Sequence, residues 1–97
     1  EHAGVTHRIP FDEILCATGR VPNTENLGLE ALGIKVERVI ETDPFMATSL
    51  PNVYACGDVA GPYQFTHTAA HGAWYATVNA LFGGLRRFKV DYAVVPW

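Results

Sequence analysis

The sequence predicts an α/β fold, and three observations indicate it. Short apolar runs alternate with turn signals rich in proline, glycine and asparagine, which is typical of strands. One longer segment, from about Thr66 to Phe82, has the length and composition of a helix. The chain has 97 residues, 48% of them hydrophobic and 18% charged, so it is one globular domain at most and not a disordered tail.

The first three predicted elements lie before residue 42. Phe11 to Thr18 predicts a strand, and its continuous apolar core, Ile14 to Ala17, suits a strand that is covered on both faces. Leu27, Leu29 and Leu32 then predict a short helical turn closed by Gly33. Ile34 to Glu41 alternates apolar and charged residues, which predicts a half-exposed strand.

A fourth strand and a long helix follow. Val53 to Cys56 predicts a short buried strand that runs into Gly57 and Asp58. The helix from Thr66 to Phe82 is apolar on nearly all sides, so we expect it to be buried. Thr66 and Thr68 are its candidate N-caps. Its other expected features are a small-residue face and a closing glycine pair (Ala69, Ala73, Ala76 and Ala80; Gly83 and Gly84).

The last segment combines cations with an apolar run. Arg86, Arg87 and Lys89 are either a solvated helix end, where cations complement the dipole, or a patch for an anionic ligand. Tyr92 to Val95 predicts the beginning of a strand without a partner.

Charge and hydropathy exclude several classes of partner. The net charge of −3 argues against nonspecific nucleic-acid binding. Ala69 to Leu85 is the most apolar stretch, but it falls short of the roughly 20 apolar residues that a membrane span needs. We therefore expect neither nucleic acid nor a membrane as a partner.

The two cysteines point to a reducing compartment. Cys16 and Cys56 are 40 positions apart, each inside an apolar run, and form no CxxC motif. We expect buried free thiols and a cytoplasmic protein. A disulfide remains open if the strands that carry the two cysteines are neighbours.

The junction at Gly57 and Asp58 is the candidate ligand site. In open α/β sheets ligands bind beyond the carboxyl ends of strands, which is where Asp58 falls. A glycine lets a ligand approach the backbone, and a carboxylate accepts hydrogen bonds from sugar-type hydroxyls. The free N–H groups of the helix that begins at Thr66 should face the same crevice. The alternative is that Asp58 only caps a turn, and spacing alone does not choose between them.

Two sequence motifs resemble those of a known family. Ala17 to Asn23 reads ATGRVPN, and Thr48 to Asp58 reads TSLPNVYACGD. Their order and separation, with an intervening Leu-Gly-Leu-Glu segment, resemble the pyridine nucleotide-disulfide oxidoreductases, especially those similar to dihydrolipoamide dehydrogenase and mercuric reductase. The resemblance covers nearly the whole chain and implies a partial FAD/NAD(P)-binding Rossmann-like domain.

The resemblance also implies a set of cofactor-binding residues. Asp58, after Gly57, would bind the ribityl chain of FAD. The start of the helix would approach the flavin pyrimidine edge through Gln64, Phe65, Thr66 and His67. Gly19 would come near the nicotinamide of NAD(P)H.

The resemblance further implies three segments of a larger protein. Residues 1–22 would be the end of the NAD(P)-binding domain with the crossover strand, and residues 23–86 the C-terminal part of the FAD-binding domain. Residues 87–97 would begin an interface domain through which members form homodimers. The dinucleotide fingerprints, the redox-active C-x4-C pair and the His-Glu acid/base pair have no counterpart, so we expect no catalytic residue in this chain.

The function implied for the parent protein is an FAD-dependent oxidoreductase that passes hydride from NAD(P)H through FAD to a disulfide or related small-molecule acceptor. The alternative is an inactive fragment that acts only as a small, strand-exchanged oligomeric module. A metal site at His67 and His71, at i and i+4, is the lesser hypothesis because no third ligand follows. We therefore expect no metal.

Overall fold

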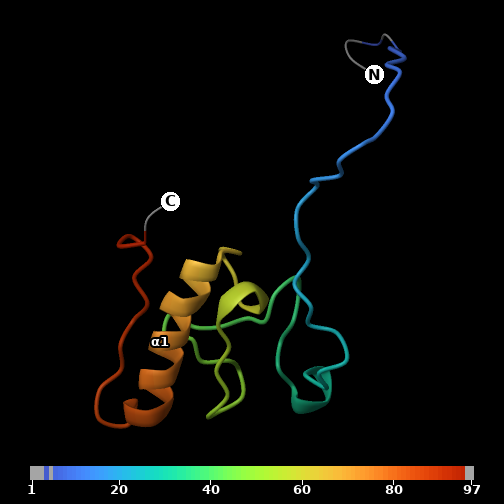
Figure 1. Cartoon of the computed structure of the whole chain (residues 1–97). Coiled ribbons are helices and arrows are strands. Elements are labelled where there is room, and N and C mark those ends of the chain that lie inside the picture. Colours follow the sequence, from blue (N-terminus) through green and yellow to red (C-terminus); the bar gives the residue numbers. More distant parts are fainter. Residues whose placement is uncertain (1–3, 5, 96–97) are drawn as a thin grey trace.

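The computed structural model describes residue 4 and residues 6–95. These residues form the 3₁₀ turn η1 (Glu30–Leu32), the 3₁₀ turn η2 (Gly57–Val59) and the α-helix α1 (Thr66–Phe82). Figure 1 shows a long extended arm at the N-terminal end and a body in which loops pack on α1. No helix within this range is long and apolar enough to cross a lipid bilayer.

The arm, residues 6–20, contains the segment predicted as the first strand, Phe11 to Thr18, and that prediction is wrong for this structure. Residues 6–20 are all exposed, with Ile14 at 72% and Leu15 at 90% of their full accessible area. Within the described chain no neighbouring strand pairs with residues 11–18. A strand needs such a neighbour for its backbone N–H and C=O groups, so this segment stays extended without ladder hydrogen bonds.

Cys16 lies on this arm, which corrects a second prediction. Its side chain is exposed and not buried, and Cys56 is half-buried. Both are free thiols, so no disulfide links the two segments.

The turn closed by Gly33 is confirmed. η1 follows Leu29, and Gly33 has a φ of 69°, the left-handed conformation that glycine adopts without steric cost. The Gly33 N–H donates to the carbonyl of Glu30 at 3.0 Å, and the Ile34 N–H donates to the carbonyl of Leu29. Ile34, directly after the turn, is only 3% exposed and belongs to the small core.

Residues 34–41 form a tight reversal and not the predicted single strand. Val36 and Ile40 face each other in one isolated antiparallel bridge, and the Glu41 N–H donates to the carbonyl of Lys35 at 3.0 Å. Local closure therefore satisfies backbone groups that a longer strand would have left for a neighbour. Ile40 is 6% exposed, and its N–H donates to the carbonyl of Val59 at 2.7 Å.

The predicted strand from Val53 to Cys56 is only one side of a short hairpin. Ala47 and Tyr54 form an isolated antiparallel bridge, flanked by a hydrogen bond from the Ala55 N–H to the carbonyl of Met46 at 3.1 Å. Residues 53–56 are half-buried, and the Tyr54 hydroxyl donates to the carbonyl of Asn79 on α1 at 3.3 Å. The described residues thus contain two bridges and no continuous sheet.

Helix α1 has the predicted bounds, but only one of its faces is covered. The buried residues of α1 recur at the spacing of a single stripe (Thr68, Gly72, Ala76 and Asn79). The opposite side is open, with Trp74 54% and Leu81 70% exposed. The prediction of an all-round buried helix is therefore wrong. The predicted alanine face is not covered along its whole length. Ala76 is buried, Ala69 and Ala73 are half-buried, and Ala80 is exposed.

The N-cap of α1 also differs from the prediction. Phe65 occupies the cap position, and Thr68 lies at the third helical position. The Thr68 hydroxyl donates to the Phe65 carbonyl at 2.8 Å and lies 3.3 Å from the Phe65 N–H. A threonine within the first turn thus binds the cap backbone, which is half of a capping box. Gly83 ends α1, as predicted.

Asn79 fastens the C-terminal segment to α1. This side chain is 1% exposed and donates to the carbonyls of Phe45 and Phe88 at 2.9 and 2.8 Å. Its Oδ1 accepts from the Phe88 N–H at 2.7 Å. The Val90 N–H then donates to the carbonyl of Pro44 at 2.9 Å. This last bond gives the C-terminal run one backbone partner, which the sequence had not indicated.

Two residues of the basic trio, Arg86 and Arg87, contact other side chains and are not only solvated cations at a helix end. Arg87 lies 3.1 Å from Asp43, and its guanidinium lies 4.2 Å from the centre of the Phe45 ring. Arg86 lies over the Phe88 ring at 5.0 Å. The predicted start of an interface domain, residues 87–97, includes Pro96 and Trp97, which lie outside the described residues.

Candidate functional site

The site forms where η2 meets the first turns of α1. Gly57 has a φ of +77°, and a β-carbon at this position would lie 3.3 Å from Cβ of Ala69. That separation is tighter than most Cβ contacts, and the positive φ strains any residue with a side chain, so glycine is favoured at this turn. The sequence therefore places glycine where the chain must turn in a left-handed conformation and approach a helix closely.

A second glycine, Gly72, lies on α1 where the segment that leads into η2 packs against the helix. A β-carbon on Gly72 would lie 3.6 Å from Cβ of Cys56 and 3.7 Å from Sδ of Met46. Gly72 is buried, and Met46 is 4% exposed. The segment that carries Asp58 is thus held against the first half of α1 by small residues on both elements.

Asp58 is the central residue of η2 and remains accessible. Its side chain is 42% exposed, and Oδ2 lies 3.9 Å from the Arg20 guanidinium, which is itself 74% exposed. An exposed ion pair at this distance contributes little to stability, about 0–1 kcal/mol. The carboxylate therefore keeps acceptor capacity for hydroxyl groups of a ligand.

Arg20, the ion-pair partner of Asp58, was not among the residues predicted for the site. It lies in the ATGRVPN segment, where only Gly19 was assigned a role. Arg20 is the charged residue of that motif, and its charge could have indicated a partner for Asp58. Gly19 adjoins Arg20 at the base of the arm and has a φ of +108°, and a β-carbon on Gly19 would meet nothing within 4 Å.

The four predicted residues at the helix start surround the N-terminus of α1. Gln64 is half-buried, whereas Phe65, Thr66 and His67 are exposed. The Phe65 and His67 rings stack with their centres 5.4 Å apart and an interplanar angle of 10°. The first N–H groups of a helix have no partner within the helix, so this end presents donors and the positive end of the dipole.

His67 and His71 each have a different partner in this structure. His71 Nε2 lies 2.7 Å from the carbonyl oxygen of Asp91, and a carbonyl only accepts, so this contact requires a proton on Nε2. His67 stacks on Phe65 instead. No group of three metal-ligating side chains occurs among residues that the structure describes.

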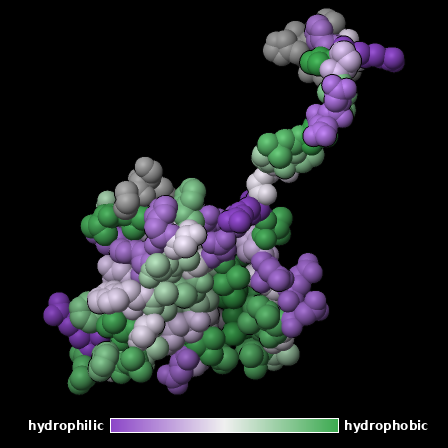
Figure 2. Space-filling model, viewed as in Figure 1, coloured by the Kyte–Doolittle hydropathy of each residue, from purple (hydrophilic) through white to green (hydrophobic). Residues whose placement is uncertain are grey.

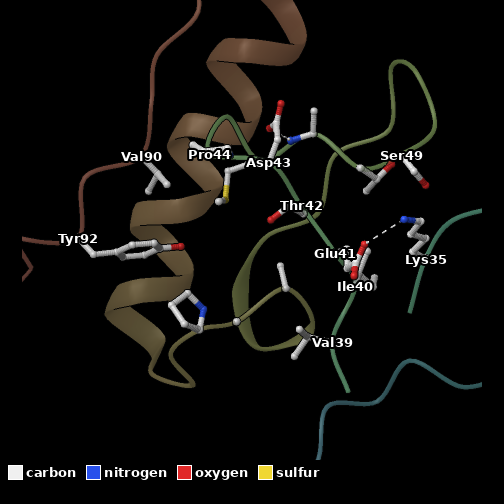
Figure 3. A pocket seen from close by; sticks show the side chains of 16 residues that line it. Lys35, Val39, Ile40, Glu41, Thr42, Asp43, Pro44, Ser49, Val90 and Tyr92 are labelled. Atoms are coloured by element: carbon white, nitrogen blue, oxygen red, sulfur yellow. Dashed lines mark hydrogen bonds and ion pairs between the residues drawn. The ribbon is translucent and has the colours of Figure 1, made fainter. Parts of the chain in front are cut away.

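A groove of about 720 Å³ lies on the other side of η2. Figure 3 shows Val90 and Tyr92 of the C-terminal segment on one side of it, and the ion pair of Lys35 and Glu41 on the other. Ala60 and Gly61, which follow η2, contribute to its wall. Its described lining includes none of the predicted site residues, so this cavity and the Asp58 site are neighbours and not the same site.

Among the residues that the structure describes, the fold shifts the pKa of Tyr92 most clearly. Burial raises the pKa of Tyr92 above the usual 10.0, and electrostatic interaction with the nearby Cys56 and Tyr63 raises this pKa further. The Tyr63 and Tyr92 rings meet edge to face at 5.3 Å. Tyr92 therefore stays a neutral phenol at physiological pH.

Comparison with known proteins gives a consistent family. The sequence model of the pyridine nucleotide-disulphide oxidoreductase family matches residues 2–73, which include Gly19, Arg20 and the whole of η2. The dihydrolipoyl dehydrogenase of Chlamydia trachomatis is 40% identical over 88 residues, which is 89% of this chain and 18% of the relative.

Two further relatives match a similar share of the chain. The mercuric reductase of Staphylococcus aureus is 42% identical over 90 residues, 91% of this chain and 16% of the relative. The dihydrolipoyl dehydrogenase of Thermus scotoductus is 46% identical over 79 residues, 79% of this chain and 17% of the relative. The chain thus spans less than a fifth of the length of these relatives. It belongs to the pyridine nucleotide-disulphide oxidoreductase family.

Proposed function

We propose that this chain forms part of the FAD site of an oxidoreductase that passes hydride from NAD(P)H to a disulfide or related acceptor. The observation that carries the proposal is the close approach of Gly57 to Ala69, which puts Asp58 beside the N-terminal turns of α1. Membership of the family and the two motifs support the same cofactor.

The residues present fit the sugar-alcohol part of FAD. The half-exposed carboxylate of Asp58 accepts hydrogen bonds from ribityl hydroxyls, and the bare Gly57 backbone leaves room for close approach. Arg20 adds a cation beside Asp58 that would attract the anionic phosphates of the cofactor.

The first turn of α1 would act on the flavin ring. Its free N–H groups, near Gln64, Phe65, Thr66 and His67, would stabilise negative charge at the pyrimidine edge. FAD, when bound, supplies the electron-accepting chemistry, and the protein supplies binding, orientation and electrostatics. Gly19 would leave the backbone open to the nicotinamide.

The remaining features of the parent protein stay predictions. They are the division into residues 1–22, 23–86 and 87–97, the cytoplasmic location and a homodimer built through the interface domain. The redox cysteines and the acid/base pair of the family would come from outside these residues.

The test is FAD binding by the whole enzyme that contains this segment. We expect Asp58→Ala to raise the dissociation constant of FAD for the apoenzyme at least about tenfold, because the variant loses the charge-assisted hydrogen bonds to the cofactor. Asp12→Ala, on the exposed arm, is the matched control and should leave FAD affinity unchanged. Equal affinity of the Asp58→Ala variant and the unmodified enzyme would refute the assignment.

A further inference from the structure

A series of five rings, which we call the aromatic chain, connects the start of α1 with the protein surface. The Tyr63 and Tyr92 rings meet edge to face with their centres 5.3 Å apart, and the centres of Tyr92 and His71 are 6.0 Å apart. His71 meets Tyr75 edge to face at 5.0 Å, and Tyr75 meets Trp74 in the same way at 4.8 Å. All four distances lie in the range of direct contact between aromatic rings.

The aromatic chain is not part of the hydrophobic core. Among the described residues, the buried apolar side chains are aliphatic or methionine, and Ile34 and Met46 are examples. The three tyrosines and the histidine of the aromatic chain are half-buried, and Trp74 is 54% exposed. Figure 2 shows that hydrophobic and hydrophilic residues are mixed on the surface of the body, which contains α1. Filling of the core therefore does not account for these contacts, and one end of the aromatic chain is open to small solutes.

Tyr92 connects the two parts of the aromatic chain. It lies in the C-terminal segment, and Figure 3 shows its ring reaching toward α1. Of its two neighbours, Tyr63 precedes α1 and His71 lies within it. His71 Nε2 also binds the carbonyl of Asp91 at 2.7 Å, which holds the backbone beside Tyr92 against the helix. A hydrogen bond and ring packing thus fix the central contact of the series.

The residue types suit the transfer of single electrons. Tyrosine and tryptophan give up one electron far more readily than phenylalanine does. Electron transfer slows steeply with distance, so short transfers between rings in contact are faster than one long transfer. His71 bridges Tyr92 and Tyr75, and because its Nε2 holds a proton, the neutral imidazole keeps Nδ1 as a proton acceptor. A base at this place favours the oxidation of phenols, which lose a proton together with the electron.

We propose that the aromatic chain moves single oxidising equivalents between the surface at Trp74 and the start of α1 at Tyr63. The oxidant is a small radical that accepts one electron. It takes an electron from the Trp74 indole and becomes an anion, and the indole proton goes to water. The Trp74 radical then regains an electron from Tyr75 and a proton from water, while the Tyr75 phenol loses that electron and its own proton. The same exchange follows from Tyr92 to Tyr75 and from Tyr63 to Tyr92.

The aromatic chain does not require FAD. Tyr63 directly precedes Gln64, one of the residues proposed to approach the flavin, so under the proposed function this end would lie beside the cofactor. Oxidising equivalents could then leave the flavin site for the surface. The ring contacts and their test involve only residues of this chain, so a failure of either proposal is distinguishable from a failure of the other.

Pulse radiolysis with the azide radical, which oxidises tryptophan in preference to tyrosine, tests the proposal. The test uses the chain with Trp97→Phe, in which Trp74 is the sole tryptophan. We expect the absorption of the Trp74 radical to decay while that of tyrosine radicals grows, at a rate that does not depend on protein concentration. A spin trap and peptide mapping should then locate adducts at Tyr75, Tyr92 and Tyr63. Trp74→Phe in the same background measures direct oxidation of the tyrosines, which is subtracted.

Tyr92→Phe separates electron transfer from packing. This variant keeps the ring and removes only the hydroxyl, so the contacts with Tyr63 and His71 should persist, and circular dichroism checks the fold. We expect the adduct at Tyr63 to be lost and the adduct at Tyr75 to be retained. Tyr54→Phe is the matched control, because the Tyr54 hydroxyl donates to the carbonyl of Asn79 and lies outside the aromatic chain. The adducts of this control should match those of the background chain.

Two results would overturn the proposal. A Tyr63 adduct that survives Tyr92→Phe would mean that the radical reaches Tyr63 by another route. Adducts at Tyr75 alone, or the same adducts in concentrated urea, would mean that Trp74 oxidises its neighbour in the sequence and that the other ring contacts serve only packing.

Discussion

Gly57 of η2 packs against Ala69 of α1 so closely that a β-carbon on Gly57 would lie 3.3 Å from Cβ of Ala69. The Gly57 φ of +77° is costly for any residue with a side chain, by about 1–2 kcal/mol. We therefore expect Gly57→Ala to lower the free energy of unfolding by about 2 kcal/mol, measured by urea denaturation.

Gly33→Ala is the control that separates backbone strain from crowding. Gly33 has a φ of 69°, but a β-carbon there would meet nothing within 4 Å. Gly33→Ala should therefore lower the free energy of unfolding by less than Gly57→Ala does, by about 1 kcal/mol. Equal losses for the two variants would show that the contact with Ala69 adds nothing.

A second prediction concerns the buried amide of Asn79. Asn79→Ala leaves the carbonyls of Phe45 and Phe88 and the Phe88 N–H without their partner. We expect a loss of about 2–4 kcal/mol of unfolding free energy, because unsatisfied buried polar groups cost more than the hydrogen bonds gain. Thr77→Ala, at an exposed position on α1, should change stability by less than about 0.5 kcal/mol.

The sequence predicted the elements whose formation is local. The bounds of α1 and the turn at Gly33 depend on helix periodicity and on the conformational freedom of glycine, both of which act within a few residues. The strands failed because a strand forms only against a neighbour. Residues 11–18 have no neighbour among the described residues, and residues 34–41 satisfy their backbone by turning back.

The candidate site was predictable to a similar extent. Gly57 and Asp58 were identified from the turn after a strand and from the motif, and the structure holds this turn against α1. Arg20 was missed because it is 38 positions from Asp58, and only the fold brings the two to 3.9 Å. Likewise, the buried stripe of α1 includes Thr68 and Asn79, whereas Trp74 and Leu81 are exposed, so residue polarity alone does not identify the covered side of the helix.

A third prediction separates the two roles of Asp43. Its Oδ1 accepts from the N–H groups of Phe45 and Ala47 at 2.8 and 2.9 Å, and its Oδ2 pairs with Arg87 at 3.1 Å. Asp43→Asn keeps an acceptor for the turn and should cost about 0.5 kcal/mol, as for other surface ion pairs. Asp43→Ala also removes the turn bonds and should cost about 1–2 kcal/mol more in thermal or urea denaturation. Equal losses for Asn and Ala would contradict a role in the turn.

A fourth prediction follows from the raised pKa of Tyr92. The unfolded pKa is 10.0 and the folded pKa is higher, so the folded state holds the phenol proton more tightly. The contribution of Tyr92 to stability is therefore complete below pH 10 and is lost as pH rises through the folded pKa. As pH rises above 10.0, urea denaturation should show a steeper loss of stability for the unmodified chain than for Tyr92→Phe. Parallel pH profiles would mean that Tyr92 titrates alike in both states.

The most direct test of the proposed flavin site is hydrogen–deuterium exchange of the whole apoenzyme before and after FAD is added. We predict slower exchange on FAD binding at the amides of residues 57–59 and residues 64–69, where η2 meets the start of α1. Protection elsewhere in the enzyme, with unchanged exchange in both of these segments, would contradict the assignment of the flavin site to Asp58 and α1.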